Sequence, residues 1–214
     1  MSNNSKLKLL ICSENKLTCL DVSRNARLKN IICDKNQLTS LYLCENGALK
    51  WLYCPKNQLK ILDVSRNHVL ESLGCDKNPL TNLDVSKNTK LKGLSCMENR
   101  LIHIDISKNS RLKSLSCQCN HLTSLDVSNN AMLTALECDK NQLKTLDITK
   151  NTKLKYLSCC ENQFTANELN NLFEKSPLQL KHISIGGNPG QHSCDWNIAE
   201  NRGCCIAYEY YEGY

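Results

Sequence analysis

The chain has 214 residues with a formal net charge of +6, and its basic excess is spread along the sequence. Aromatic residues make up only 5% of it, so its core must be built from aliphatic side chains and cysteine. Without a concentrated basic tail, we do not expect nucleic acid as a partner. No apolar run approaches the roughly 18 residues of a membrane span, and residues 1–6 are too polar for a signal peptide.

A 21-residue unit recurs from Leu7 without any insertion. Its first position is Leu, its fourth Leu or Ile, its sixth Cys and its ninth Asn. A repeat of this length predicts a solenoid, in which each coil contacts only its neighbours. The eight coils begin at Leu7, Leu28, Leu49, Leu70, Leu91, Leu112, Leu133 and Leu154.

Each coil contains two similar arcs, because positions 11, 14 and 16 are again apolar and Asn returns at position 19. The alternation within LxL and LDV triplets predicts short strands that are buried on one side. Stacked coils should form two parallel sheets, or one sheet that faces a looser extended wall. We expect the asparagines to tolerate left-handed backbone and to form two hydrogen-bonded ladders.

Fifteen cysteines would suggest a disulfide scaffold, but eight of them occupy position 6 of the repeat. A cysteine that alternates with leucines behaves as a small buried hydrophobe, so we expect reduced thiols stacked inside the solenoid. This interpretation fits both a reducing and an oxidising compartment. The eight residues are Cys12, Cys33, Cys54, Cys75, Cys96, Cys117, Cys138 and Cys159.

The motifs LxxLxCxxNxL and LTxLDVSxN together resemble those of the bacterial leucine-rich repeat family. The cysteine column resembles the cysteine-ladder subclass of this family, which includes proteins like internalin J and secreted proteins of gut Bacteroidetes. The resemblance covers Leu7 to about Gly203. It implies a right-handed superhelix of α/β type, mostly β, with eight 21-residue coils. Coil two departs from the pattern at residues 41–44, and coil eight lacks the second arc.

The last arc is replaced by a capping box at Thr165 and Glu168, which predicts a helix that Pro177 stops. A strand over 181–185, a turn at 186–190 and a short helix from Cys194 should follow. This helix-strand-helix cap resembles the terminal cap of the same proteins. We divide the chain into a disordered remnant (1–6), a solenoid (7–174), a cap (175–203) and an irregular tail (204–214), and infer that an upstream cap and export signal are missing.

Catalytic motifs are absent from the sequence, so we expect no enzyme, no catalytic residue, no cofactor and no resident metal. Two metal alternatives stay open. The tail carries zinc-ligand types at His192, Cys194, Cys204 and Cys205, where a disulfide from Cys194 to Cys204 or Cys205 is a further alternative. Asp recurs at position 15 and could bind calcium, although neighbouring Lys, Arg, Ser and Thr residues can stabilise the column instead.

Outward positions of the strands are free to vary, and in coils one to three they are apolar except for Asn30. Exposed Trp and Tyr side chains are typical of binding hot spots, whereas coils four to six carry Ser and Gly there. The alternative is that a lost N-terminal cap once covered this patch. The candidate ligand-binding residues are Leu9, Ile11, Ile32, Trp51 and Tyr53.

Position 2 is Lys in six of the eight coils, which gives the solenoid a basic edge. A polyanion could follow this edge, although solubility is the commoner reason for such a stripe.

These patterns predict a non-catalytic protein that recognises a protein or a surface glycan through the exposed strand face. The resemblance implies an extracellular or cell-surface location, and we expect a monomer. One alternative is the recognition arm of a larger bacterial effector whose catalytic domain lies outside this chain. Another is a stalk without a partner. The preference for the recognition function over these two alternatives rests on fold analogy.

Overall fold

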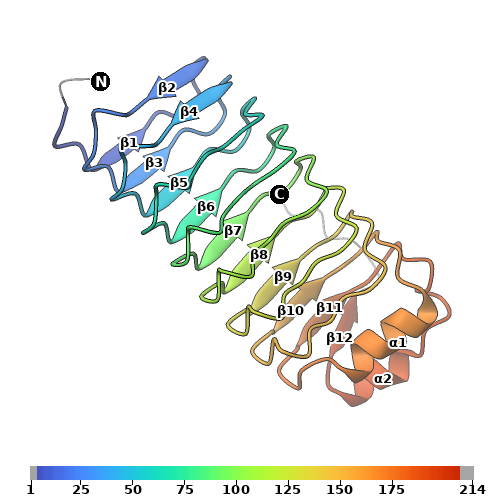
Figure 1. Ribbon diagram of the computed structural model, residues 1–214. Coiled ribbons are helices and arrows are strands. Elements are labelled where there is room, and N and C mark those ends of the chain that lie inside the picture. The colour runs from blue at the N-terminus through green and yellow to red at the C-terminus, as the bar shows by residue number, and fades with distance from the viewer. Residues whose placement is uncertain (1–3, 208–214) are drawn as a thin grey trace.

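The structure is a computed structural model that describes residues 4–207. It is an elongated solenoid in which consecutive coils stack side by side (Figure 1). Ten strands form one parallel sheet in the order β1-β3-β5-β6-β7-β8-β9-β10-β11-β12, and β2 pairs with β4 in a second sheet. The predicted repeat solenoid is confirmed, with strands that recur every 21 residues.

The secondary structure consists of three-residue strands and two short helices. The strands are β1 (Leu9–Ile11), β2 (Cys19–Asp21), β3 (Asn30–Ile32), β4 (Ser40–Tyr42), β5 (Trp51–Tyr53), β6 (Ser72–Gly74), β7 (Gly93–Ser95), β8 (Ser114–Ser116), β9 (Ala135–Glu137), β10 (Tyr156–Ser158), β11 (His182–Ser184) and β12 (Cys205–Ala207). The helices are α1 (Ala166–Glu174) and α2 (Trp196–Asn201).

The strands of the long sheet form where the sequence alternates around position 4. In β7, Leu94 is buried while Gly93 and Ser95 on either side of it are half-buried. Each strand pairs with the next in register, so that Gly93 meets Ser114 and Leu94 meets Leu115. Positions 3 and 5 of every coil therefore lie in straight rows on the outer surface of the sheet.

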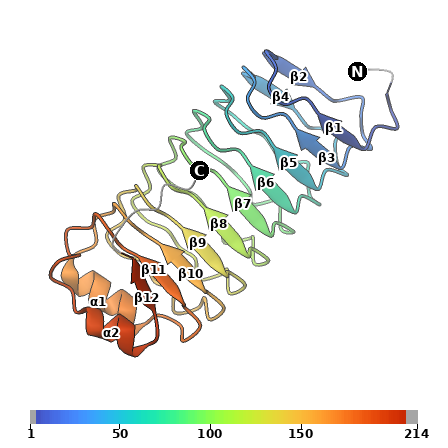
Figure 2. The ribbon, with the colours of Figure 1, turned by 180° about the vertical axis from the view of Figure 1, so that it is seen from behind.

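The second arcs form a hydrogen-bonded sheet only in the first two coils, as β2 and β4. In later coils this side is an extended wall with turns, where Asn109 N bonds to Ile106 O and Leu112 N bonds to Asn109 O. Most of the solenoid thus follows the second of the two expected arrangements. Figure 2 shows the same stack from behind, with both helices at its C-terminal end.

The core is a continuous column of leucines and cysteines. The position-6 cysteines from Cys33 to Cys159 are fully buried, and all fifteen cysteines are free thiols. Burial raises the pKa of these thiols, in Cys33 and Cys117 to about 12. Cys12 is only half-buried because it lies beside β1, the edge strand of the sheet.

The asparagines at position 9 hold neighbouring coils together through the backbone. The Nδ2 of Asn99 donates to the carbonyls of Cys75, Cys96 and Met97, each at 3.1 Å. Its Oδ1 accepts from the backbone N–H of Leu80 at 3.1 Å. One side chain therefore satisfies four backbone groups in two coils.

The asparagines at position 19 are bonded differently. The Nδ2 of Asn109 donates to the carbonyls of Val85 (3.0 Å) and Asn88 (2.9 Å) in the preceding coil. Its buried Oδ1 has no hydrogen-bond partner within the described residues, and five equivalent asparagines share this property. These five are Asn46, Asn67, Asn88, Asn130 and Asn151.

The expectation that asparagine would adopt the left-handed backbone is wrong. In every coil the left-handed residue is the one at position 8, for example Lys77 (φ 53°) or Glu98 (φ 50°). The asparagine that follows keeps its side chain directed at backbone groups on both sides. The turn therefore places the strain on the residue before the asparagine, which is Lys or Glu in every coil except at Cys119.

The C-terminal cap follows the predicted helix-strand-helix order. Thr165 caps α1 by accepting from the N–H of Glu168, and Phe173 packs near Trp196 of α2 with ring centroids 6.1 Å apart. The tail prediction needs correction, because Cys205–Ala207 form β12 in register with β11. Residues 208–214 of that tail and residues 1–3 lie outside the described residues.

Candidate recognition surface

The candidate residues lie together on three adjacent strands. Leu9 and Ile11 belong to β1, Ile32 to β3, and Trp51 and Tyr53 to β5. Trp51 is 58% exposed and Ile11 is 61% exposed, whereas Ile32 is half-buried. The fold thus brings residues from three coils into one apolar patch.

The register of the sheet fixes how the patch is arranged. Position 5 forms a row from Ile11 through Ile32 to Tyr53, and position 3 forms a row from Leu9 through Asn30 to Trp51. Neighbouring strands are about 4.8 Å apart, so these side chains are within contact distance of one another. The patch is therefore held on a rigid surface before any ligand binds.

Tyr53 has a defined place because its partner on β6 is Gly74. A Cβ at Gly74 would lie 2.7 Å from Cδ2 of Tyr53, so the glycine leaves the space that the ring fills. An aromatic ring packed over a cross-strand glycine protects the backbone beneath it. Burial on this side raises the pKa of the Tyr53 hydroxyl.

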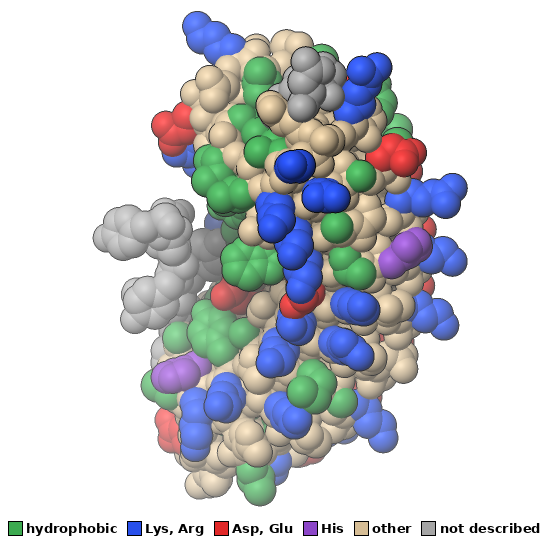
Figure 3. Space-filling view, turned by 90° about the vertical axis from the view of Figure 1, so that its left-hand side faces the viewer, with side chains coloured by type: hydrophobic (Ala, Val, Ile, Leu, Met, Phe, Trp, Pro, Cys, Tyr) green, Lys and Arg blue, Asp and Glu red, His purple; other side chains and the backbone are tan. Residues whose placement is uncertain are grey.

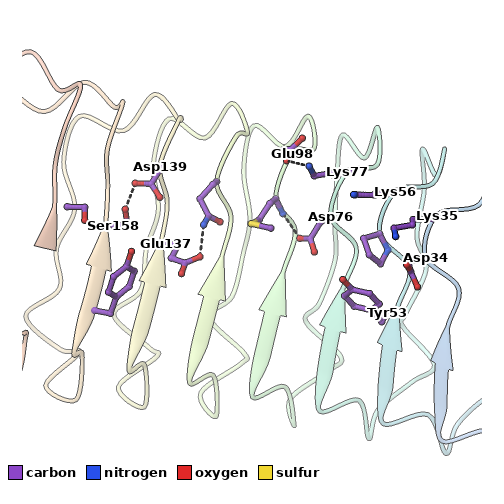
Figure 4. Close-up of a pocket in the computed structure, with 15 residues that line it drawn as sticks. Asp34, Lys35, Tyr53, Lys56, Asp76, Lys77, Glu98, Glu137, Asp139 and Ser158 are labelled. Carbon is purple, nitrogen blue, oxygen red and sulfur yellow. Dashed lines mark hydrogen bonds and ion pairs between the residues drawn. The ribbon is translucent and has the colours of Figure 1, made fainter. Parts of the chain in front are cut away.

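A groove of about 590 Å³ runs along the end of the strands, next to the patch. It is formed by positions 5, 7 and 8 of successive coils, and Tyr53 belongs to both the patch and the groove. Figure 4 shows Lys35, Lys56 and Lys77 toward one end, and Glu137 and Asp139 toward the other. The lysines alternate with Asp34, Asp76 and Glu98, so the groove has mixed charge near β5 and is acidic near β9.

The buried carboxylates of the groove link one coil to the next. Oδ1 of Asp76 accepts from Ser95 Oγ (2.5 Å) and from the N–H of Met97 (2.8 Å). Asp139 repeats this contact with Ser158 Oγ and the N–H of Cys160. Desolvation raises the pKa of both carboxyl groups, although these hydrogen bonds oppose it.

Gln118 occupies the middle of the groove and is almost completely buried. Its Nε2 donates to Oε2 of Glu137 at 2.5 Å. Its Oε1 has no hydrogen-bond partner within residues 4–207.

The sequence analysis missed this groove, since positions 7 and 8 vary in residue type from coil to coil. Asp34, Asp76 and Asp139 share position 7, and Lys35, Lys56 and Lys77 share position 8. Only the stacking of coils shows that these residues border one cavity. The available signal was the recurrence of charged residues directly before the invariant asparagine.

The remaining sequence candidates have structural partners. Each Asp of position 15 accepts from the backbone N–H two residues later, as Asp105 does from Ser107 at 2.9 Å. Sγ of Cys194 donates to Gln191 O, and Sγ of Cys204 donates to Leu180 O, so the two thiols are not bridged. Within the described residues, no group of three or more His, Cys, Asp or Glu is placed to hold a metal ion.

Neither helix within residues 4–207 has the length and hydropathy of a membrane-spanning segment.

No protein-family model matches the sequence, and no curated protein matches it. Solved structures do match. The functional domain of InlJ from Listeria monocytogenes, which includes a cysteine ladder, aligns with a TM-score of 0.85 and 35% identity, over 94% of this chain and 44% of that chain. A leucine-rich repeat protein of Leptospira interrogans aligns with a TM-score of 0.83 and 24% identity, over 95% of this chain and 55% of that chain.

An internalin, InlF, from Listeria monocytogenes aligns with a TM-score of 0.70 and 24% identity, over 87% of this chain and 63% of that chain. This chain spans about half the length of the InlJ and Leptospira structures. The chain is a parallel-strand solenoid with a column of buried cysteines, and its structural neighbours are internalin J, which includes a cysteine ladder, and other bacterial leucine-rich repeat proteins.

Proposed function

We propose that this chain recognises a protein or surface-glycan ligand without catalysis, and that the ligand docks on the apolar patch formed by Leu9, Ile11, Ile32, Trp51 and Tyr53. The observation that supports this function is the patch itself. Trp51 and Tyr53 are 58% and 47% exposed on a sheet whose next three strands, β6 to β8, carry only Ser and Gly at the outward positions. Structural neighbours that are recognition proteins support the same function.

Docking on this patch would be favourable for two physical reasons. Large aromatic side chains bury much area when they are covered, and they often supply most of the binding energy of an interface. The patch also loses little conformational freedom on binding, because the parallel sheet and the space over Gly74 already orient Tyr53. The groove beside Tyr53 adds charged and hydrogen-bonding groups at the rim.

The likeness to internalins supports an extracellular or bacterial-surface location, with the chain acting as a monomer. In this arrangement the solenoid presents its sheet to a partner on another cell or in the surrounding medium.

The test is capture of surface proteins from intact epithelial cells by cross-linking to the immobilised chain. Trp51→Ala combined with Tyr53→Ala should reduce the amount of the specifically captured ligand at least tenfold. The matched control is Ile61→Ala with Ile102→Ala, which removes two exposed apolar side chains (78% and 68%) from the opposite wall. Unchanged capture by the Trp51 and Tyr53 variant, or equal loss in the control, would refute the proposal.

A further inference from the structure

Two rows of basic side chains follow the edge of the solenoid where the strands begin. They occupy positions 21 and 2 of the repeat, which are separated only by the buried leucine of position 1. Together they hold eleven of the 27 Lys and Arg residues, all of them exposed. This basic band consists of Arg27, Lys90, Arg111 and Lys153 at position 21, and Lys8, Lys29, Lys50, Lys92, Lys113, Lys155 and Lys181 at position 2 or its equivalent before β11.

The backbone holds the position-2 row in strict register. The N–H of Lys50 donates to Lys29 O at 2.8 Å, and the N–H of Lys113 donates to Lys92 O at 2.8 Å. The same bond recurs up to Lys181, whose N–H donates to Lys155 O at 2.8 Å. Cationic side chains are therefore spaced by multiples of about 4.8 Å over roughly 38 Å.

Few acidic groups neutralise this band. Glu71 is its one carboxylate, and it pairs with Lys50 (3.3 Å) and Lys92 (2.5 Å). The neighbouring cations at position 18 are not counted in this band, because carboxylates at position 15 interact with them, as Asp105 does with Lys108. Figure 3 shows Lys and Arg side chains gathered along this side of the molecule, with few acidic side chains among them.

We propose that the basic band is a second binding site, separate from the strand-face patch, and that it takes an acidic polysaccharide lying along the solenoid axis. Such a polymer carries carboxylate or sulfate groups at regular intervals on an extended chain. Successive anionic groups can therefore meet the lysines of successive coils. Binding would release counterions from the polymer, which makes it strongly dependent on salt.

The composition of the band favours a polysaccharide over nucleic acid. Single-stranded nucleic acid is usually held by aromatic side chains on which bases stack, and positions 20, 21 and 2 contain no Phe, Tyr or Trp. Duplex DNA is usually read by a helix or ribbon that enters a groove, whereas this edge is a series of short turns. The phosphates of a duplex also wind around its axis, so a straight row meets only some of them.

The test measures binding of the full chain to polygalacturonate and to heparin across a sodium chloride series. The band variant combines Lys29→Glu, Lys113→Glu and Lys155→Glu. The matched control combines Lys56→Glu, Lys60→Glu and Lys144→Glu, which reverse three cations outside the band, two of them exposed on the opposite wall and one on the groove. Either triple takes the formal net charge from +6 to zero, so the two proteins differ only in where the charge is lost.

We expect the band variant to bind at least tenfold more weakly, with a salt slope shallower by about three, and the control to change less than threefold. Trp51→Ala with Tyr53→Ala should leave polysaccharide binding unchanged, which separates this site from the strand face. Equal losses in both triples would show a net-charge effect and overturn the proposal. Absence of binding at low salt, or equally tight binding of duplex DNA, would also overturn it.

Discussion

The two asparagine columns predict a clear difference in stability within one coil. In Asn99→Ala the two amide hydrogens of Nδ2, which are shared among three carbonyls, and the bond accepted by Oδ1 are all lost. At about 1 kcal/mol for each of these three hydrogens, the variant should lose about 3 kcal/mol of unfolding free energy. One of the groups left without a partner is the buried N–H of Leu80, and buried N–H groups are rarely left unsatisfied.

Asn109→Ala is the matched control, because the same side chain is deleted from an equally buried site ten residues away. It removes only two hydrogen bonds, worth about 2 kcal/mol. It also removes a buried Oδ1 that has no partner within the described residues, whose burial costs about 1 to 3 kcal/mol. The net effect of these two terms should lie between a loss of about 1 kcal/mol and a gain of about 1 kcal/mol, and the cavity contribution should be similar in both variants.

Equilibrium unfolding in guanidinium chloride, followed by circular dichroism, gives both free energies. Hydrogen exchange at the Leu80 amide provides a local check, since that amide should exchange faster in Asn99→Ala and unchanged in Asn109→Ala. If Asn109→Ala costs as much as Asn99→Ala, counting hydrogen bonds is the wrong account of these columns.

Two further predictions concern the thiols and the acid response. With Ellman's reagent at pH 8, the exposed Cys19, Cys44 and Cys205 should react quickly, whereas the buried position-6 cysteines from Cys33 to Cys159 should react only after unfolding, because burial raises their pKa, in Cys117 to about 12; fast reaction of these buried thiols in the native protein would contradict this. Hydrogen bonds from position 17 lower the pKa of Asp105 below 3.8, so their stabilisation is complete above that pH and is lost as pH falls through the folded-state pKa. The contribution of Asp105 to the melting temperature should therefore be lost as pH drops below 3.8, and Asp105→Asn, which keeps the acceptor but does not titrate, should show a smaller fall.

The sequence by itself predicts the strands, the buried thiols and the cap helix. In a solenoid each coil contacts mainly its neighbours, so the local pattern that buries Leu94 and Cys96 is also the tertiary pattern. The capping box at Thr165 likewise predicts α1, because a cap depends on residues within one turn. The sequence also predicts the basic edge formed by the position-2 lysines, because stacked repeats place equal positions in one row.

Only the tertiary structure decides how variable residues meet across coils. The left-handed residue is at position 8 because the asparagine side chain must bond to backbone in two coils, which no single coil reveals. The place of Tyr53 depends on the absence of a side chain at Gly74, 21 residues later. The groove and the β12 strand also arise from contacts between coils. Packing between repeats thus creates the candidate binding surfaces, whereas the residue pattern within each repeat is enough to predict the fold.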